Sequence, residues 1–388
     1  MTGSTTPDQD RPTTREDLNL IPSYVPGKTT PGALKLASNE MTQGPLPSVR
    51  DAIVDAAAGI NRYPDMAAVD ARTTIADHLG LPTPHVAVGC GSSALCQQLI
   101  QATCTDGDEV IFAWRSFEAY PILARVAGAV PVAVPLDADH RHDLDAMAAA
   151  IGDRTRLVFI CNPNNPSGTT ITAAEFEAFM AKVPANVLVA LDEAYIEFVQ
   201  PADGDRGTGG RATGVDTANA IDAVAKYPNV VGLRTFSKVY GLAGLRIGYV
   251  FGAAEIIEAI NKVCIPFSVN ALAQVAAVES LRAVDELEAR IAGVRDQRVR
   301  VTAAINGAAG AEVVVPDSQT NFVWLPEDRL AALAGVGSLS DADVVDSPSF
   351  GAFLAEKGII VRFFGGEGVR ITVTDAAETD RLLAALGL

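Results

Sequence analysis

Short apolar runs recur along the first two thirds of the chain, and most of them are apolar at every position. A run of this kind fits a strand that is buried on both faces of a sheet. We expect such strands at residues 86–88, 109–112, 130–134, 157–160, 187–191, 230–233 and 247–250. Helical patterns fall between many of these runs, including 93–103 and 173–181. This alternation predicts an α/β fold with a mainly parallel sheet and helices on both of its faces.

The pattern changes after about residue 270. Residues 271–305 are typical of long helices, and we expect strands after them at 312–315, 321–325, 359–362 and 369–373. This order predicts a smaller α+β domain. The expected division is a polar, disordered tail over 1–16, an N-terminal segment over 17–45 that packs on the small domain, a large domain over 46–270 and the small domain over 271–388.

Two stretches interrupt this pattern as insertions. Residues 201–214 are rich in glycine and charge, which is typical of a surface loop. Residues 331–349 are expected to form a second excursion, on the small domain. Neither stretch carries obvious chemistry, so we interpret both as inert loops, and a lid role for the first stays open.

The composition indicates a soluble cytoplasmic protein. Its 30 basic and 47 acidic residues give a formal charge of −17, which argues against nucleic acid as a partner. No apolar run is long enough to span a membrane, and the N-terminus has no apolar signal core. The five cysteines, an odd number without close pairs, indicate reduced thiols. The four histidines have no metal-ligand spacing; His140 and His142 flank Arg141 in a polar loop and are expected to be solvated.

Residues 235–249 hold the most informative motif, Thr-Phe-Ser-Lys-Val-Tyr-Gly-Leu-Ala-Gly-Leu-Arg-Ile-Gly-Tyr. Apolar surroundings favour the neutral form of Lys238, and a neutral amine attacks carbonyl carbons to form a Schiff base. Thr235, Ser237 and Arg246 are candidates to hold a phosphate nearby. An aldehyde that carries a phosphate, bound beside a reactive lysine, describes pyridoxal phosphate. The alternative is a surface lysine in a glycine-rich loop.

Two motifs upstream follow expected strands. Asp192 and Tyr195 come directly after the run 187–191, at the kind of strand end where open α/β sheets bind ligands. An Asp there can pair with a protonated pyridine nitrogen, and Tyr195 can reach the phenolic oxygen of the same ring. Asn165 lies in the turn 161–169, whose prolines and glycine hold its amide rigidly. A helix N-cap for Asp192 and an ordinary strand-exit loop for Asn165 are the alternatives.

In this order, the three motifs resemble those of fold-type I pyridoxal-phosphate aminotransferases. Within that group the chain is similar to the histidinol-phosphate aminotransferase family, and especially to the aromatic amino acid (phenylalanine) aminotransferase branch close to it. The resemblance is carried by residues 24–28, 35–40, 44–48, 61–65, 89–92, 162–168, 192–195, 237–248, 319–322 and 369–373. It implies a seven-stranded sheet in the large domain and pyridoxal 5'-phosphate as the cofactor.

The resemblance also implies roles at the cofactor. Lys238 would bind the cofactor covalently and then move the proton of the substrate's alpha carbon. Asp192 would pair with the pyridine nitrogen, while Asn165 and Tyr195 would bond the phenolic oxygen. Phe117 would lie over the ring, with a plain core position as its alternative. The phosphate would be held at a helix start and by polar side chains, namely Gly91, Ser92, Ser93, Thr235, Ser237 and Arg246.

For the substrate, the resemblance implies that Arg370 clamps the acidic end as a bidentate partner of a carboxylate or phosphate. A solvated position on an edge strand is the alternative for this arginine. Tyr63 would reach the phosphate from the neighbouring subunit, which makes a homodimer part of the site. The other residues implied for the substrate pocket are Arg362, Tyr24, Asn39 and Asn321.

The expected reaction is ping-pong transfer of an amino group to 2-oxoglutarate, with phenylalanine and tyrosine as donors and tryptophan as a third candidate. Histidinol-phosphate enzymes usually carry Asn-Glu-Asn-Pro where this chain has Ser-Asn-Glu-Met at 38–41, which favours the aromatic branch. Histidinol phosphate is the first alternative substrate. Another pyridoxal-phosphate reaction, such as decarboxylation or elimination, and a non-catalytic cofactor-binding regulator are the other classes considered. Arg370 favours transamination, while the short N-terminus and the negative charge disfavour a regulator fused to a DNA-binding module.

Overall fold

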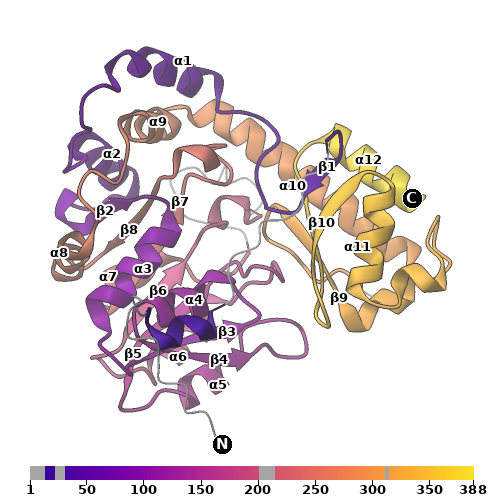
Figure 1. The fold of residues 1–388 in the computed structure, drawn as a ribbon, viewed down its shortest axis with the longest axis horizontal. Coiled ribbons are helices and arrows are strands. Elements are labelled where there is room, and N and C mark those ends of the chain that lie inside the picture. The colour runs from indigo at the N-terminus through magenta and orange to yellow at the C-terminus, as the bar shows by residue number, and fades with distance from the viewer. Residues whose placement is uncertain (1–13, 22–30, 201–214, 311–313) are drawn as a thin grey trace, which may run out of the picture.

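The computed structural model describes residues 14–21, 31–200, 215–310 and 314–388. These residues form a large and a small lobe, each built around one sheet, and helix α10 (Val284–Ala308) runs from one lobe to the other (Figure 1). Features expected from the sequence that lie wholly or partly outside the described residues are the tail at 1–16, Tyr24, the insertion at 201–214 and the strand start at 312–313. None of the helices in the described residues combines the length and apolar character that a membrane span requires.

Seven strands form the sheet of the large lobe, in the order β2-β8-β7-β6-β5-β3-β4. Neighbouring strands are parallel except β8, which is antiparallel to both β2 and β7. The strands are β2 (Val86–Gly89), β3 (Glu109–Trp114), β4 (Val130–Pro135), β5 (Thr155–Cys161), β6 (Leu188–Asp192), β7 (Val230–Thr235) and β8 (Gly248–Gly252). The predicted mainly parallel α/β sheet is therefore confirmed, with strand ends that shift by one or two residues, as element ends usually do.

Both faces of this sheet are buried except along the edge strand β4, and this burial explains why the other strands are apolar at nearly every position. Successive side chains of a strand point to opposite faces. In β3, Val110 and Phe112 pack into one core, while Ile111 and Ala113 pack into the other. The strands β5 and β6 divide their side chains between the same two cores, so neither face tolerates polar residues.

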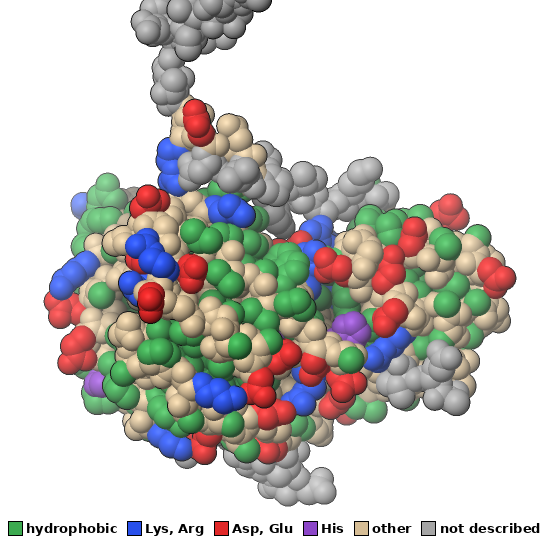
Figure 2. Space-filling model, turned by 90° about the horizontal axis from the view of Figure 1, so that it is seen from below, with side chains coloured by type: hydrophobic (Ala, Val, Ile, Leu, Met, Phe, Trp, Pro, Cys, Tyr) green, Lys and Arg blue, Asp and Glu red, His purple; other side chains and the backbone are tan. Residues whose placement is uncertain are grey.

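Helices cover both faces of the large sheet. One face is covered by α3 (Ser92–Thr103), α4 (Ala119–Val126) and α8 (Ala254–Val263). The other is covered by α1 (Pro47–Ala56), α2 (Val69–Leu79), α5 (Leu144–Ala149), α6 (Ala173–Met180), α7 (Ala220–Lys226) and α9 (Ala271–Arg282). Short 3₁₀ turns are η2 (Ala57–Gly59), η3 (Thr83–His85), η4 (Ile196–Phe198) and η5 (Ala243–Leu245). On the face that Figure 2 shows, Lys and Arg side chains are interspersed with Asp and Glu.

The small lobe contains a four-stranded sheet in the order β1-β10-β11-β9, in which β1 is parallel to β10 and the other neighbours are antiparallel. Its elements are β1 (Leu34–Leu36), β9 (Phe322–Pro326), β10 (Ile359–Phe364), β11 (Gly368–Thr372), α11 (Ser347–Glu356) and α12 (Ala376–Leu386). The N-terminal segment is divided between the lobes. While β1 joins the small sheet, η1 (Glu16–Leu20) lies against α4, where Arg15 donates to the backbone oxygens of Arg125 and Val126.

The division between the lobes differs from the expected boundary at 270/271. Helix α9 and Val294 of α10 belong to the core under the large sheet, while Val301 and Ile305 of α10 belong to the core of the small lobe. The change of pattern at residue 271 marks the start of long helices, but a helical pattern does not indicate which sheet the helix covers. We therefore propose a boundary inside α10, between Val294 and Val301.

One local expectation in the small lobe is wrong. Val314 and Val315, the described end of the strand expected at 312–315, form no strand, because the side-chain oxygen of Asn306 accepts both of their backbone N–H groups. The segment 331–349, expected as an excursion on the small domain, is partly helical and contributes to the core of this lobe. It contains the end of η6 (Glu327–Leu333), η7 (Asp341–Val344) and the start of α11, and its side chains packed in the small-lobe core are Leu333, Leu339 and Val344.

Candidate active site

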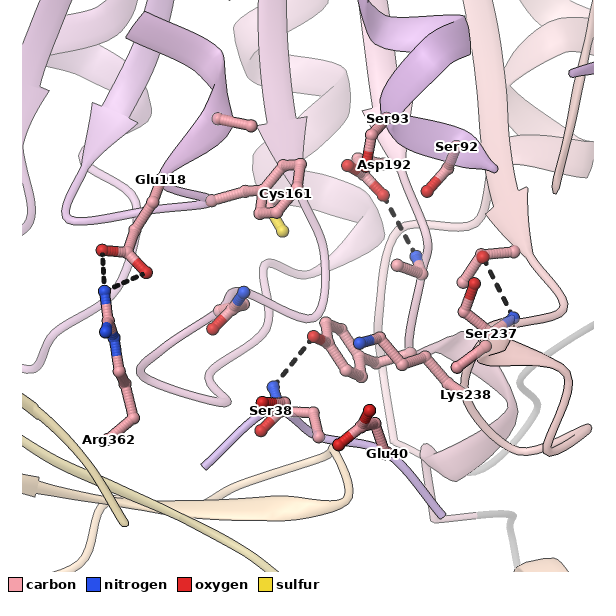
Figure 3. Close-up of a pocket in the computed structure, with 18 of the residues that line it drawn as sticks. Ser38, Glu40, Ser92, Ser93, Glu118, Cys161, Asp192, Ser237, Lys238 and Arg362 are labelled. Atoms are coloured by element: carbon pink, nitrogen blue, oxygen red, sulfur yellow. Dashed lines mark hydrogen bonds and ion pairs between the residues drawn. The ribbon is translucent and has the colours of Figure 1, made fainter. Parts of the chain in front are cut away.

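A pocket of about 560 Å³ lies where the two lobes meet, at the carboxyl ends of β5, β6 and β7. Its lining includes Cys161 at the end of β5, Asp192 at the end of β6 and Thr235 at the end of β7. Parallel strands end at the same sheet edge, so residues far apart in the sequence meet there, as they do in ligand sites of open α/β sheets. Figure 3 shows this pocket with side chains from both lobes around it.

Most residues that the sequence predicts for the site line this pocket. They are Asn39, Ser92, Ser93, Phe117, Asn165, Asp192, Tyr195, Thr235, Ser237, Lys238, Arg246, Arg362 and Arg370. Gly91 lies directly behind the lining, where it contacts Arg246. Asn321 is not among the lining residues, and its amide donates to the backbone oxygen of Asn39 at 3.2 Å. Tyr63 is 82% exposed and lies outside the pocket of this chain.

Lys238 projects into the pocket from the segment after β7, and its Nζ lies 5.4 Å from the ring centre of Tyr195 (Figure 3). Burial disfavours the charged ammonium, and the nearby guanidinium of Arg370 disfavours it further. Together they lower the pKa of Lys238 to about 8. A neutral amine is therefore accessible at mildly alkaline pH, and it can act as a nucleophile or accept a proton.

Asp192 is a buried carboxylate, 3% exposed, whose two oxygens are both held. Its Oδ2 accepts from the phenolic O–H of Tyr120 at 2.7 Å, and its Oδ1 accepts from the backbone N–H of Ala194 at 3.2 Å. Burial raises the pKa of Asp192, while these two hydrogen bonds and the charge of Lys238 oppose the rise. A carboxylate oriented in this way suits a cationic N–H group in the pocket.

One end of the pocket is suited to an anion. Ser92 and Ser93 begin the 12-residue helix α3, whose free N–H groups and dipole favour negative charge. Arg246 lies at the same end and donates from Nη1 to Oγ of Ser237 at 3.2 Å. The preceding Gly91 has a φ of +79°, and a Cβ there would overlap the guanidinium of Arg246. Glycine is therefore the residue that lets the arginine approach the helix start.

Arg370 is 7% exposed and lies on β11, between β9 and β10, so the alternative of a solvated edge position is excluded. Its Nη1 donates to Oδ1 of Asn165 at 2.5 Å, and its Nη2 donates to the backbone oxygen of Ala37 at 2.7 Å. These contacts fix the plane of the guanidinium. They also fix Asn165, whose amide nitrogen is turned away from Arg370.

Tyr195 is oriented by Asn39. The Nδ2 of Asn39 donates to the hydroxyl oxygen of Tyr195 at 2.9 Å, so the tyrosine directs its own proton to another acceptor. Oδ1 of Asn39 accepts from the hydroxyl of Thr372 at 3.1 Å. Both ends of the Asn39 amide are thus engaged within the protein. Asn39 lines the pocket and at the same time supports Tyr195.

The opposite end of the pocket combines apolar side chains with one ion pair. Nη2 of Arg362, on β10, donates to both carboxylate oxygens of Glu118, at 2.9 and 3.2 Å. Figure 3 shows this pair across the pocket from Ser92 and Ser237. Glu118 directly precedes α4 in the large lobe, so the pair also connects the lobes. The apolar residues of the same turn and helix that line the pocket are Phe117, Ala119 and Ile122.

Sequence reasoning missed Glu118 and Tyr120, both in the segment that follows β3. Tyr120 comes three residues after Phe117, and its backbone N–H donates to the backbone oxygen of Phe117 at 3.1 Å in the turn before α4. Their rings are 5.4 Å apart in an edge-on arrangement. Ser38 and Glu40 were also missed as lining residues, although both flank Asn39 in a motif that had been singled out.

The expectation that His140 and His142 are solvated is wrong for His142, which is 7% exposed, and His140 is half-buried. Burial lowers the pKa of His142 to about 4. Within the described residues, no group of three or more His, Cys, Asp or Glu side chains is arranged to hold a metal ion.

The groups in this pocket fit pyridoxal phosphate. A helix start, hydroxyls and a guanidinium suit its phosphate. Asp192 suits a protonated ring nitrogen, and the amine of Lys238 suits the aldehyde carbon. Phe117 lies in the pocket wall, where an aromatic side chain can stack on a planar ring.

Comparison with known proteins agrees with this chemistry. Residues 31–386 match the family model described as aminotransferase class I and II. The chain is 56% identical to an aromatic amino acid aminotransferase of Corynebacterium glutamicum (strain R), over 96% of this chain and 97% of that protein. It is equally 56% identical to an aromatic amino acid aminotransferase of Rhodococcus jostii (strain RHA1), over 96% of this chain and 95% of that protein.

A solved structure extends the likeness to the cofactor. The histidinol-phosphate aminotransferase from Sinorhizobium meliloti in complex with pyridoxal-5'-phosphate has a TM-score of 0.75 and 29% identity to this chain, and the match covers 92% of this chain and 90% of that one. The predicted fold-type I architecture and the predicted cofactor, pyridoxal phosphate, are confirmed by these matches. The chain belongs to the class I and II aminotransferases, a family of enzymes that depend on pyridoxal phosphate.

Proposed function

We propose that this aminotransferase moves the amino group of aromatic amino acids to 2-oxoglutarate, with phenylalanine and tyrosine as the main donors and tryptophan as a third. The observation that carries the proposal is the composition of the pocket, in which the amine of Lys238 and the buried guanidinium of Arg370 share one cavity with an apolar wall. The two relatives at 56% identity are named aromatic amino acid aminotransferases, which supports the same donors.

Arg370 would hold the carboxylate that all amino acid donors share. A guanidinium binds a carboxylate through two parallel N–H···O bonds, and this arginine is held in place by Asn165 and Ala37. The aromatic ring of the donor would then lie against the apolar wall formed by Phe117 and Ile122. Burial of apolar surface contributes about 25 cal/mol per Å², so a large uncharged ring gains more there than a small side chain.

Pyridoxal phosphate, when bound, supplies an electron-accepting ring that stabilises charge at the substrate's alpha carbon. The residues of this chain would do the rest. Lys238 would hold the cofactor covalently until the amine of the substrate takes its place. The freed Nζ would then accept the alpha proton and return a proton from the same atom, which its lowered pKa favours. Asp192 would keep the ring nitrogen protonated, and Tyr195, oriented by Asn39, would donate to the phenolic oxygen together with Asn165. The residues proposed to hold the phosphate are Gly91, Ser92, Ser93, Thr235, Ser237 and Arg246.

Histidinol phosphate is the second candidate donor, because the Sinorhizobium meliloti enzyme named for that substrate is 29% identical to this chain. A phosphate dianion at the far end of the pocket would bring two negative charges to the guanidinium of Arg362, whereas a carboxylate brings one. Glu118, which pairs with Arg362, would add its own repulsion to the phosphate. This pair favours an uncharged side chain over a phosphorylated one.

We also propose a homodimer in which Tyr63 reaches the phosphate site of the partner subunit. The ring of Tyr63 packs on Phe267 with centroids 4.8 Å apart, and Gln274 donates to the backbone oxygen of Asp65 at 2.8 Å, so two distant stretches form one surface. Exposed apolar surfaces of this kind mark protein–protein contacts. The large apolar side chains exposed on these two stretches are Val54, Ile60, Tyr63, Met66, Val69, Ile265 and Phe267. A cytoplasmic location without nucleic-acid or membrane partners completes the proposal.

The substrate proposal is tested by a stopped-flow half-reaction. Holoenzyme is mixed with phenylalanine, or separately with histidinol phosphate, without an acceptor, while the absorbance of the bound cofactor is followed. Fast conversion with phenylalanine and slow conversion with histidinol phosphate, followed by recovery on addition of 2-oxoglutarate, supports the proposal. The reverse preference between the two donors overturns it. Lys238→Ala is the control that must not convert with either donor.

A further inference from the structure

Four charged side chains of alternating sign follow one another at the far end of the pocket. Arg362 donates to both oxygens of Glu118, at 2.9 and 3.2 Å. Arg115 lies 3.8 Å from Glu118 and donates from Nη2 to Oε1 of Glu367 at 2.5 Å. Glu118 and Arg115 belong to the large lobe, while Arg362 and Glu367 belong to the small lobe.

Only two of these four charged side chains line the pocket. Glu118 and Arg362 line the pocket, whereas Arg115 and Glu367 are not among its lining residues. The guanidinium of Arg115 is instead held over the ring of Trp114, at 4.4 Å from its centre. The far end of the pocket therefore contains one pair of opposite charges, Glu118 and Arg362, and Arg115 links this pair to Glu367 behind it.

Glu118 is free of the local role that its position suggests. It occupies the N-cap position of α4, where acidic side chains often bond a backbone N–H group of the first turn. Here the side chain makes no such bond. Among the described residues, Arg362 forms an ion pair with Glu118 and with no other carboxylate. The position of this carboxylate is thus explained by Arg362 and by the pocket, not by the helix.

A transaminase with the proposed substrates has to bind two different groups in the same pocket, one after the other: the aromatic ring of the donor and the terminal carboxylate of 2-oxoglutarate. An aromatic ring loses binding energy next to an unpaired guanidinium, because the guanidinium would be desolvated without a partner. The terminal carboxylate of 2-oxoglutarate needs such a cation. The Glu118–Arg362 pair meets both demands if the carboxylate of the acceptor can take the place of Glu118.

We propose that Glu118 is a specificity-determining residue of this site. As the counter-ion of Arg362 it keeps the far end of the pocket electrically neutral for aromatic side chains, and the terminal carboxylate of a dicarboxylic substrate displaces it. The side chains of Glu118 and Arg362 are 38% and 33% exposed, and ion pairs in such positions are weak enough to exchange. This inference rests on the proposed function, since it assumes that one pocket serves both substrates.

The decisive variant is Glu118→Gln, which keeps the shape of the side chain and removes its charge. Half-reactions with glutamate and with phenylalanine are measured on holoenzyme, and their kcat/KM values are compared. The variant removes the counter-ion and the repulsion of a second carboxylate, so the glutamate-to-phenylalanine ratio should rise about tenfold. Arg362→Met should lower the ratio, and the double variant should show no further rise from the change at Glu118.

Glu367→Gln is the matched control. It breaks the other ion pair between the lobes, with Arg115, at a position outside the pocket lining. Its glutamate-to-phenylalanine ratio should equal that of the wild type. If Glu118→Gln leaves the ratio unchanged, or lowers kcat/KM equally for both substrates, the specificity role of Glu118 is wrong while the proposed function stands. If the wild type itself fails to convert with phenylalanine, the proposed function fails and this inference fails with it.

Discussion

The protonation states of Lys238 and Asp192 depend on neighbouring residues that are not themselves nucleophiles or acids in the proposed reaction. Lys238 is buried near Arg370, and both the burial and the positive charge favour its neutral amine. Asp192 is buried as well, but the O–H of Tyr120 stabilises its ionised form. Burial alone would neutralise both groups. The hydrogen bonds from Tyr120 and Ala194 and the charge of Lys238 oppose the rise in the pKa of Asp192 and so favour its charged form.

The lowered pKa of Lys238 predicts how the protein stripped of cofactor takes it up. Only the neutral amine attacks the aldehyde of pyridoxal phosphate, and its fraction rises as pH rises through the pKa. The rate of covalent uptake should therefore increase with pH and level off above a midpoint near 8. An unperturbed lysine would give a midpoint near ~10.4. Stopped-flow absorbance over a pH series measures this midpoint.

Arg370→Gln provides the matched variant for that measurement. It removes the second cause of the lowered pKa and leaves burial in place, so the midpoint should move upward. A midpoint that stays where it is would mean that Arg370 has no electrostatic influence on Lys238.

Tyr120→Phe should weaken catalysis through Asp192 without changing the packing. The ring of Tyr120 stacks on Phe159 with centroids 4.5 Å apart, and phenylalanine can keep that contact. Loss of the O–H···O bond raises the pKa of Asp192, so the ionised carboxylate is lost at a higher pH as the solution is acidified. We expect kcat to fall about tenfold, or ~1.4 kcal/mol, and the acidic limb of the pH–rate profile to move to higher pH.

The control for this variant is Tyr227→Phe. Its ring packs edge-on against Phe176, 6.4 Å away, and it does not line the pocket. Both its kcat and its acidic limb should match the wild type. An acidic limb that does not move in Tyr120→Phe would show that Tyr120 positions Asp192 without setting its ionisation.

The residues that the sequence could predict are those within short motifs, such as Lys238 and Asp192. Two of the residues that it missed, Glu118 and Tyr120, bond to partners that are far away in the sequence. Tyr120 and Asp192 are 72 residues apart, and Glu118 and Arg362 are 244 residues apart. No local pattern records such a pair, because the contact exists only once the lobes and the sheet edge have formed.

At the scale of elements, the site depends on the junctions where strands end and helices begin. The junction between β2 and α3 is the tightest of those at the anion end. Gly91 has a φ of +79° there, and a side chain would collide with Arg246. Gly91→Ala should therefore push the arginine away from the helix start and lower the affinity for pyridoxal phosphate about tenfold or more. Equilibrium dialysis or fluorescence titration with the cofactor measures the effect.

Gly80→Ala is the control that distinguishes the effect of backbone strain from the effect of a collision with Arg246. Gly80 ends α2 with a φ of +70°, but a Cβ there would meet no atom within 4 Å. Both variants should lose about 1 kcal/mol of folding stability from the strained backbone. Only Gly91→Ala should lose cofactor affinity. Equal cofactor affinity in the two variants would contradict the role assigned to the contact with Arg246.

The elements themselves follow from the sequence where a single physical cause dominates. The seven strands of the large sheet were predictable because they are almost continuously apolar, as burial on both faces requires of six of them; the edge strand β4 is largely exposed. The expected strand at 312–315 misled because Val314 and Val315 are equally apolar and buried, yet the side chain of Asn306 takes their backbone N–H groups. An apolar sequence indicates that a segment is buried. Whether the buried segment is a strand depends on whether its backbone N–H groups bond to a neighbouring strand or to another acceptor.

At the scale of the whole molecule, the pocket exists only where the lobes meet. Three contacts cross it: Arg370 with Asn165, Asn39 with Tyr195, and Arg362 with Glu118. In each contact one partner comes from the small lobe or its N-terminal strand and the other from the large lobe. The relative position of the lobes therefore controls three features together: the position of Arg370, the proposed substrate clamp; the orientation of Tyr195; and the pairing of Arg362 with Glu118 at the far end of the pocket. The sequence could not give this coupling, because the boundary lies inside one continuous helix, α10.

The proposed homodimer is also a property of the whole molecule, and it predicts that Phe267→Asp yields monomers. Phe267 is 42% exposed against Tyr63 in the apolar surface described above, and a buried, unpaired carboxylate would strongly disfavour association. Light scattering coupled to size-exclusion chromatography measures the mass. Val345→Asp is the matched control, because Val345 is 71% exposed in the small lobe, away from that surface. It should leave both the mass and the activity unchanged.

Tyr63→Phe then tests whether the partner subunit completes the active site. The variant keeps the ring and should stay dimeric, but it loses the hydroxyl proposed to reach the phosphate of the partner. Cofactor should therefore dissociate faster, roughly tenfold for the loss of one hydrogen bond to a charged group. A Phe267→Asp protein that remains dimeric would show that another surface forms the interface. A dimeric Tyr63→Phe protein with unchanged cofactor release would confine each active site to its own chain.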